Sequence, residues 1–422
     1  MAQSRGSNVY GDRVSEHQPV GLDAASPSVP LRVIAREWGR IGCTGFGGPP
    51  AHIALLRDLC VKRRGWLSAE EFEDGVAAVN LLPGPASTQL AIFCAWRLAG
   101  TAGALVGGLC FIVPGLILIL ALSALFLAHS PPAWVTGAAA GAGAAVPAVA
   151  VSATASLMPA SWRRAAAGNG AQAGDQARMG AAAARGRWVC YLIAGGLAAG
   201  LAGEFVVVVL LCCGLAELLI RRPPARGTGS SHVWLGPLAW RAGAAAGGLL
   251  SLAWVALKVG ALSFGGGFVI IPLMQQDAVH TYHWMTGAQF LSAVALGQVT
   301  PGPVVQTVAV VGYAAGGVGG GLLASADAFA PSFVFVLVGG RHFDAFRASR
   351  RAQAFLCGAG PAAIGAIAGA AVTLGLELTR IWQIAVLAAA LLWLLGLRRG
   401  LVTAILGAAG VGIIVALAGG VG

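Results

Sequence analysis

The amino-acid sequence predicts an all-α integral membrane protein, a polytopic helical bundle built from two inverted-topology repeats with discontinuous helices. Three observations predict this fold: the composition, long apolar runs, and internal repetition. The chain has 422 residues, of which 57% are hydrophobic and only 10% are charged. Soluble proteins contain about 25% charged residues. A chain this apolar exposes more hydrophobic surface than one soluble core can bury.

Apolar runs long enough to cross a bilayer, about 20 residues each, recur along the chain. The clearest are Ala102–Ala128, Ala133–Met158, Leu238–Leu262 and Val402–Ala418. The 63 glycines favour close helix packing, since small residues let transmembrane helices approach one another. Trp134, Trp188 and Trp382 lie at the edges of apolar runs, as interfacial aromatic residues do.

The net charge of +11 comes mostly from short polar segments between apolar runs. Such a distribution is typical of the positive-inside rule, and it is also compatible with attraction of anionic substrates. We therefore expect a multi-pass protein of the cell (inner or plasma) membrane. It should contact lipid and bind no nucleic acid. The eight cysteines form no CxxC pair or Cys/His cluster, so no metal site and no cofactor are predicted. Residues 1–30 are polar and have no apolar h-region, so we expect no signal peptide.

The chain repeats itself at a shift of 218 residues, which places Phe46 on Phe264. About fifteen of the next sixty positions then match without gaps. The repeats cover roughly residues 31–220 and 238–422 and follow a polar N-terminal tail, residues 1–30. A basic linker, residues 221–237, joins them, and a polar stretch within the first repeat, Pro159–Arg187, is expected to be a flexible loop.

The charges of equivalent loops predict that the two repeats have opposite orientations. Lys62, Arg63 and Arg64 align with a segment of the second repeat that has no fixed positive charge. Conversely, the segment that contains Arg347 and Arg351 aligns with one that has no Lys or Arg. Because basic loops prefer the cytoplasm, equivalent loops should lie on opposite sides. The apolar stretch Trp188–Ile220 would then leave and return as a hairpin.

Two motifs interrupt the apolar segments at matching positions of both repeats. Proline pairs break the helical hydrogen-bond ladder, and the freed backbone groups must face protein or a wet cavity. We expect a discontinuous helix or re-entrant hairpin there, with a simple kink as the alternative. Glycine-rich turns and half-helix N-termini suit an anion. Paired interruptions point to a midplane binding site. The motifs are Phe46-Gly47-Gly48 with Phe264-Gly265-Gly266, and Pro83-Gly84-Pro85 with Pro301-Gly302-Pro303.

Polar residues near these motifs complete the predicted substrate site. Thr88-Gln89 and Gln306-Thr307 align in swapped order and are candidate neutral donors, with helix–helix hydrogen bonding as the alternative. The cations Arg97 and Lys258 lie in apolar runs and either act on the substrate or extend to an interface. His52 has a packing role or a ligand or proton role. Asp327 is a further ionisable candidate, whereas Glu204 and Glu217 mark the edges of a short run.

Several stretches of this sequence resemble the chromate ion transporter (CHR) family, in its long two-repeat form. They are Phe46-Gly-Gly-Pro-Pro-Ala-His-Ile, Arg63-Arg-Gly-Trp-Leu, Leu81-Leu-Pro-Gly-Pro-Ala-Ser-Thr-Gln-Leu-Ala-Ile, Phe111-Ile-Val-Pro-Gly, Phe264-Gly-Gly-Gly and Gly297-Gln-Val-Thr-Pro-Gly-Pro-Val. The resemblance covers roughly residues 32–420. It implies about ten to thirteen spans and secondary active export of chromate, with chromate resistance.

Chromate and sulfate are both tetrahedral dianions, so we expect sulfate to compete or to be exchanged. A sulfate or other oxyanion importer is the main alternative, because the topology does not give a direction of transport. No catalytic motif such as GxSxG or HExxH is present, so the chain is not expected to be an enzyme. A membrane-embedded enzyme and a passive anion channel are weaker alternatives. A homodimer is a candidate assembly.

Overall fold

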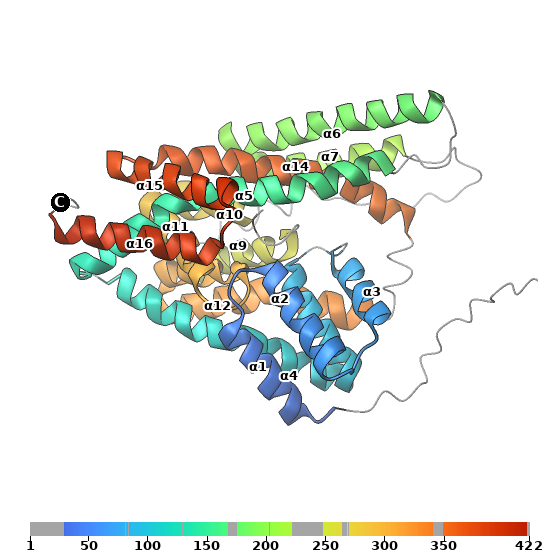
Figure 1. The fold of residues 1–422 in the computed structure, drawn as a ribbon, viewed down its shortest axis with the longest axis horizontal. Coiled ribbons are helices and arrows are strands. Elements are labelled where there is room, and N and C mark those ends of the chain that lie inside the picture. Colours follow the sequence, from blue (N-terminus) through green and yellow to red (C-terminus); the bar gives the residue numbers. More distant parts are fainter. Residues whose placement is uncertain are drawn as a thin grey trace, which may run out of the picture.

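The computed structural model describes residues 29–80, 82, 84–128, 130–167, 175–201, 203–221, 248–263, 268, 270–340 and 349–419. Every regular element within these residues is a helix, which confirms the all-α fold (Figure 1). Four helices are long and apolar enough to cross a membrane, and shorter apolar helices accompany them. The protein is therefore a multi-pass membrane protein. The N-terminal tail, residues 1–28, and most of the predicted linker lie outside the described residues.

The first repeat comprises α1 (Leu31–Thr44), α2 (Pro49–Arg57), the π-helical segment η1 (Asp58–Arg63), α3 (Ala69–Val79), α4 (Ala86–Phe126), α5 (Ala133–Ala167), α6 (Asp175–Leu201), the short η2 (Gly203–Phe205) and α7 (Val206–Ile220). The second comprises α9 (Leu249–Leu262), α10 (Ile270–Gln275), the π-helical η4 (Gln276–Thr281), α11 (Gly287–Val299), the short η5 (Val304–Gln306), α12 (Thr307–Gly339), α14 (Arg350–Leu376), α15 (Ile381–Leu391), the π-helical η7 (Leu392–Gly396) and α16 (Leu401–Leu417).

The internal duplication is visible in the fold itself. Helices α1 and α9 both have 14 residues and begin 218 positions apart. The segments η1 and η4 are both π-helical and begin at the same shift. Helices α3 and α11 both begin with a capping box, Ser68 with Glu71 and Thr286 with Gln289. Because π-helical turns are rare, their recurrence in register is strong support for the duplication.

Helices α4 and α12 each fold back on themselves. In α4 the backbone leaves the helical conformation at Ala99 and Gly100, where Gly100 has φ 61° and ψ −151°. That region is accessible essentially only to glycine. A Cβ on Gly107 would lie 2.4 Å from the Cβ of Ala95, so residues 101–126 run back along residues 86–98. Helix α12 does the same at Gly317, with φ 62° and ψ −153°.

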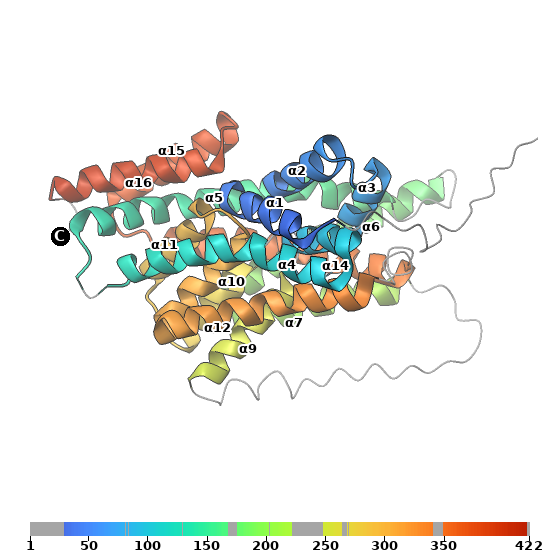
Figure 2. The same cartoon turned by 90° about the horizontal axis from the view of Figure 1, so that it is seen from below.

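Equivalent helices of the two repeats run in opposite directions. The long arms of α4 and α12 lie side by side, as Figures 1 and 2 both show. Gly108 of α4 contacts the ring of Phe333, whereas Leu120, further along α4, contacts Gly321, which precedes Phe333. The contacts therefore advance along α4 as they retreat along α12. This antiparallel pairing agrees with the inverted topology that the loop charges predict.

The remaining helices are exchanged between the repeats. Helices α6 and α7 pack on α14, and α15 and α16 pack on α5 (Figure 1). Glycines allow these contacts: a Cβ on Gly195 would lie 1.9 Å from the carbonyl oxygen of Ala362, and one on Gly141 would lie 2.1 Å from that of Ala408. Such close backbone approach is typical of small-residue membrane helix packing. Each repeat thus completes the packing of the other.

The predicted flexible loop at Pro159–Arg187 is largely helical, which corrects the sequence analysis. Helix α5 continues to Ala167 and α6 begins at Asp175. The stretch is rich in alanine, the strongest helix former, and this outweighs its polar character. Trp162 and Trp188 also meet edge to face at a centroid distance of 4.9 Å, which ties the two helices together. The predicted hairpin over Trp188–Ile220 is present as α6 and α7.

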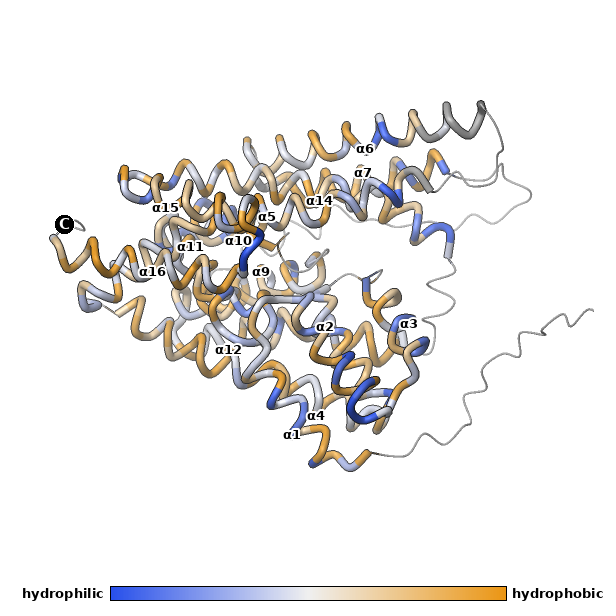
Figure 3. Tube along the Cα trace, in the orientation of Figure 1, coloured by the Kyte–Doolittle hydropathy of each residue, from blue (hydrophilic) through white to orange (hydrophobic). Residues whose placement is uncertain are grey.

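Hydrophilic stretches gather at one end of the bundle (Figure 3). There η1 leads into α3, and the hydrophilic part of α6 lies at the same end. Within it, the buried Glu217 accepts hydrogen bonds from Arg187 at 2.9 and 3.1 Å, from Arg221 at 2.6 Å and from Tyr191 at 3.2 Å.

Candidate functional site

The PGP motifs form the tips of re-entrant helical hairpins. Gly75 of α3 lies against the ring of Phe93 in α4, so the two helices run antiparallel on either side of the first motif. In the second repeat, Gly297 of α11 lies against Thr307 of α12 in the same way. The start of α4 and the start of α12 are both buried. The chain therefore turns back between α3 and α4 and between α11 and α12, rather than continuing as one kinked helix.

The FGG motif of the first repeat forms a similar tip. Trp38 of α1 stacks on Trp66 at a centroid distance of 6.4 Å, and the guanidinium of Arg64 pairs with the carboxylate of Glu37 at 2.6 Å. Helix α1 and the end of η1 therefore lie side by side, and residues 45–48 turn between them. The N–H of Gly302 donates to the carbonyl of Gly45 at 3.0 Å. The FGG tip of one repeat is thus bonded to the PGP tip of the other.

Each PGP tip also contacts the long arm of the opposite repeat. A Cβ on Gly115 of α4 would lie 2.1 Å from the carbonyl oxygen of Pro301 and 2.5 Å from Oε1 of Gln306. Nε2 of Gln306 donates to the carbonyl of Ile112 at 2.7 Å. In the symmetric position, Ser332 Oγ would lie 3.5 Å from a Cβ on Gly84.

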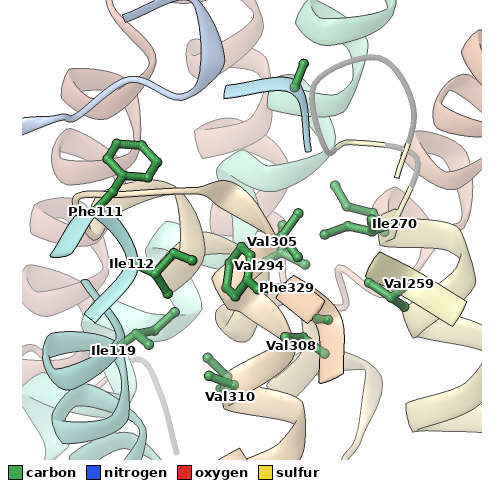
Figure 4. Close-up of a cluster of buried hydrophobic side chains, with 14 of the residues drawn as sticks. Phe111, Ile112, Ile119, Val259, Ile270, Val294, Val305, Val308, Val310 and Phe329 are labelled. Atoms are coloured by element: carbon green, nitrogen blue, oxygen red, sulfur yellow. The ribbon is translucent and has the colours of Figure 1, made fainter. Parts of the chain in front are cut away.

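Apolar side chains of both repeats surround this junction (Figure 4). They include Phe111, Ile112, Val305 and Phe329. The polar tip groups therefore sit in an apolar core formed by both repeats. Any polar group left unpartnered there is costly.

The structural register of the two repeats shifts by one residue after the PGP motif. Gly100 and Gly317, which break α4 and α12, are 217 residues apart, as are Pro114 and Pro331. The amide of Gln89 lies beside Gly84, and that of Gln306 beside Gly302. Gln89 is therefore the structural equivalent of Gln306. The swapped order inferred from the ungapped alignment is wrong, because the second repeat has one residue fewer at this point.

Unpartnered polar atoms collect around the tips. Among the described residues, the buried side chains near the motifs that have a nitrogen or oxygen without a hydrogen-bond partner include these five: His52 Nδ1, Thr88 Oγ1, Ser263 Oγ, Gln306 Oε1 and Ser332 Oγ. Leaving such an atom unsatisfied costs about 1–3 kcal/mol. Atoms of this kind in a native structure mark a place for a ligand or water. Both repeats contribute to the set, as a site between them requires.

Two members of this set, Ser263 and Ser332, were not predicted from the sequence. Ser263 directly precedes the second FGG motif and is fully buried. Ser332 follows Pro331 in the long arm of α12 and is also fully buried. The position of Ser263 beside the motif was an available signal. Ser332 lies more than two hundred residues from the tip that it meets, so only the fold could reveal it.

His52 is held tightly at the FGG tip. Its ring is fully buried, and its Nε2 lies 2.9 Å from the carbonyl of Gly45. The ring of Phe111 packs against it edge to face at 5.1 Å. A Cβ on Gly45 would lie 2.8 Å from the imidazole, so glycine at that position makes room for the ring. Of the five groups named above, only His52 is ionisable.

The helix N-termini at the site differ in the donors they offer. Helix α2 begins with Pro49 and Pro50, which have no N–H, and the next two N–H groups bond to the carbonyl of Gly48. Helix α4 begins at Ala86, and its first intrahelical donors are Thr88 and Gln89, both bonded to the carbonyl of Pro85. The N–H groups before these lie outside the helical ladder. Backbone donors for an anion are therefore better supplied by α4 than by the FGG turn.

The structure pairs both predicted cations with carboxylates rather than bringing them to the tips. Arg97 forms an ion pair with Glu71, the capping residue of α3. Lys258 of α9 forms an ion pair with Asp277 of η4, and both side chains are nearly buried. A buried charge requires such a partner. Their positive charge is thus largely compensated locally.

The other predicted residues divide between the tips and their surroundings. Phe46 is 45% exposed and points away from the packed core. The hydroxyl of Thr307 donates to the carbonyl of Val304 at 2.9 Å, where η5 joins α12, so it supports the local turn. Asp327 lies half-buried on α12. Pro83 and Phe264-Gly265-Gly266 lie outside the described residues.

Comparison with known proteins agrees with this architecture. The family model described as chromate transporter matches residues 33–218 and 250–413, which are the two repeats. The chain is 30% identical over 359 residues to a chromate transport protein of Cupriavidus metallidurans, covering 83% of this chain and 84% of that protein. It is 29% identical over 385 residues to a chromate transport protein of Pseudomonas aeruginosa, covering 87% and 86% respectively.

A probable chromate transport protein of Synechococcus elongatus is 28% identical over 360 residues, with 83% of this chain and 86% of that protein covered. No solved structure matches the chain. The family model extends over both repeats, including the tips described above. The chain therefore belongs to the chromate transporter family.

Proposed function

We propose that this protein is a secondary active transporter that exports chromate and thereby confers chromate resistance. Two lines support the proposal: membership of the chromate transporter family, and the site at the hairpin tips. The observation that carries it is the set of buried, unpartnered polar atoms that both repeats place at these tips. Inverted repeats with a site between them are the usual architecture of secondary transporters.

The chemistry of the tips suits a tetrahedral oxyanion. Thr88, Ser263 and Ser332 each carry a hydroxyl that can donate to an anion oxygen. Gln306 uses one amide hydrogen for the carbonyl of Ile112 and retains a second. The N-terminus of α4 adds backbone donors and a partial positive charge. Sulfate presents the same oxygen pattern as chromate, so it competes for the site or is exchanged.

Arg97 and Lys258 contribute to anion binding in this proposal through their field rather than by contact. Each is paired with a carboxylate, so its net effect at the tips is reduced. The anion is therefore held mainly by neutral donors. Such donors distinguish oxyanions by size and hydrogen-bonding pattern more than by charge.

Transport requires the tips to open alternately to the two sides. The PGP hairpins enter from opposite sides, because the long arms that follow them are antiparallel. Rocking of one repeat against the other would move the same site from one side to the other. The basic end, which contains Lys62–Arg64, faces the cytoplasm in this proposal, with the protein in the plasma membrane and a homodimer as its candidate assembly.

Chromate uptake into inside-out membrane vesicles tests the proposal. Uptake above that of empty vesicles, inhibited by excess sulfate, is expected of the wild type. The Pro83→Ala/Pro85→Ala variant, at equal protein level, should lose this uptake, because the prolines no longer restrict the backbone of the turn. Sulfate flux in the inward direction alone would favour an importer instead. Absence of chromate uptake in the wild type would remove the assignment.

A further inference from the structure

We infer that His52 carries a proton together with the anion, so that the protein is a proton–oxyanion cotransporter that moves one net negative charge per chromate dianion. This inference rests on the proposed function and identifies how the same site is coupled. Three features of the imidazole carry it: its fixed tautomer, its unpartnered nitrogen, and its occurrence in one repeat only.

The surroundings of His52 determine which nitrogen carries the proton in the neutral ring. Nε2 lies 2.9 Å from the carbonyl of Gly45, and a carbonyl oxygen only accepts hydrogen bonds. Nε2 therefore carries the hydrogen. The same carbonyl also accepts the N–H of Gly302 at 3.0 Å, which links the ring to the tip of the opposite repeat. Nδ1 is left with a lone pair, buried and without a partner.

A bare Nδ1 cannot bind an oxyanion, because both present lone pairs to each other. Protonated Nδ1 donates a hydrogen bond and adds one positive charge. An anion at the tips therefore binds the protonated form more tightly, and by linkage the proton binds the anion-loaded form more tightly. The proton comes from water on the side where the anion enters and leaves from Nδ1 on the other side with the anion.

Among the described residues, the ring of His52 contacts Gly45 and Phe111, and neither is ionisable. The equivalent position of the second repeat is Ile270, so each site has one such imidazole. Helix α2, which carries the ring, packs on η1, α4 and α1. The titratable and charged groups of these elements closest to the ring in sequence include Cys43 of α1 and Arg57 of α2, which pairs with Glu73 at 3.0 Å. In η1 they are Asp58, which pairs with Arg63 at 2.6 Å, and the buried Cys60, and in α4 the half-buried Cys110.

The inference also follows from the cost of a dianion at the midplane. Ionised groups inside a bilayer are expensive, and the described tips otherwise offer neutral donors. Protonation of His52 lowers the charge of the loaded site from two to one. Anion binding and proton uptake then occur together. The conformational change that moves the site from one side to the other therefore does not take place with an uncompensated dianion bound.

The charge moved per anion is measured as a reversal potential in proteoliposomes that contain the full chain, with potassium and valinomycin setting the potential. A tenfold chromate gradient without a pH gradient is balanced by about 59 mV when one net charge moves and by about 30 mV when two move. We expect about 59 mV for the wild type and a shift of that potential when a pH gradient is imposed.

The variants His52→Gln and His52→Asn retain an amide donor but cannot be protonated. Transport should be slower, reversal should occur near 30 mV, and the pH gradient should have no effect. His280→Gln, an exposed histidine of η4, is the matched control and should behave as wild type. If both variants are inactive, a tenfold sulfate gradient across the wild type decides, because sulfate remains a dianion near neutral pH and cannot carry the proton itself. About 59 mV with sulfate supports a proton on the protein, and about 30 mV overturns the inference.

A wild-type reversal near 30 mV, or 59 mV retained in an active His52 variant, would overturn the inference while leaving chromate transport intact. The latter result would mean that the proton travels on the anion rather than on His52. Absence of chromate flux in the wild type would instead overturn the proposed function itself.

Discussion

Replacing Gly115 by alanine should disable transport by displacing the tip of the opposite repeat. The new Cβ would lie 2.1 Å from the carbonyl oxygen of Pro301, and ordinary contact begins near 3.4 Å. The tip would therefore have to move by about 1.3 Å, the difference between those two distances. Overpacking of this kind costs about 1–3 kcal/mol. If that cost falls on the closed, loaded state, affinity drops by roughly 5- to 150-fold.

Chromate uptake into inside-out vesicles, at matched protein levels, measures this effect. The apparent KM for chromate should rise in Gly115→Ala, and cross-inhibition by sulfate should weaken in parallel. Gly319→Ala is the matched control, since Gly319 has no atom within 4 Å of an added Cβ. Uptake by Gly115→Ala at the wild-type KM, with the bundle intact by thermal unfolding, would refute the close contact between α4 and the PGP tip.

Other variants test separate parts of the structure. Thr88→Val should raise the KM for chromate about tenfold with little loss of thermal stability, since the hydroxyl of Thr88 has no protein partner. Thr307→Val should instead lower the free energy of unfolding by about 1 kcal/mol, because the hydroxyl of Thr307 bonds to the carbonyl of Val304. An unchanged KM in Thr88→Val would argue against a donor role. Gly100→Ala should destabilise the fold by about 1–3 kcal/mol, because its backbone conformation excludes a side chain. Glu217→Ala should lower the thermal unfolding temperature, because it leaves the guanidinium groups of Arg187 and Arg221 without their carboxylate. Adding Arg187→Ala to that variant should cause little further loss if Glu217 and Arg187 act as one network.

The amino-acid sequence by itself determined the class of protein and its internal plan. Hydropathy is a property of local stretches, so membrane helices and their interruptions at PGP can be located without a structure. The repeat was evident because identical residues recur at one shift, and the loop charges predicted its inversion. Local composition was a poor guide only at Pro159–Arg187, where alanine favours helix over the predicted loop.

The tertiary structure alone decided which of the candidate residues meet. The bonds from Gly302 to Gly45 and from Gln306 to Ile112 join residues nearly two hundred or more positions apart, so no local pattern encodes them. The one-residue shift that pairs Gln89 with Gln306 was hidden in an ungapped alignment. Likewise, a cation in an apolar run has the same appearance whether it faces a substrate or a carboxylate. Only the fold shows that Arg97 and Lys258 have carboxylate partners, whereas His52 retains a buried nitrogen without one.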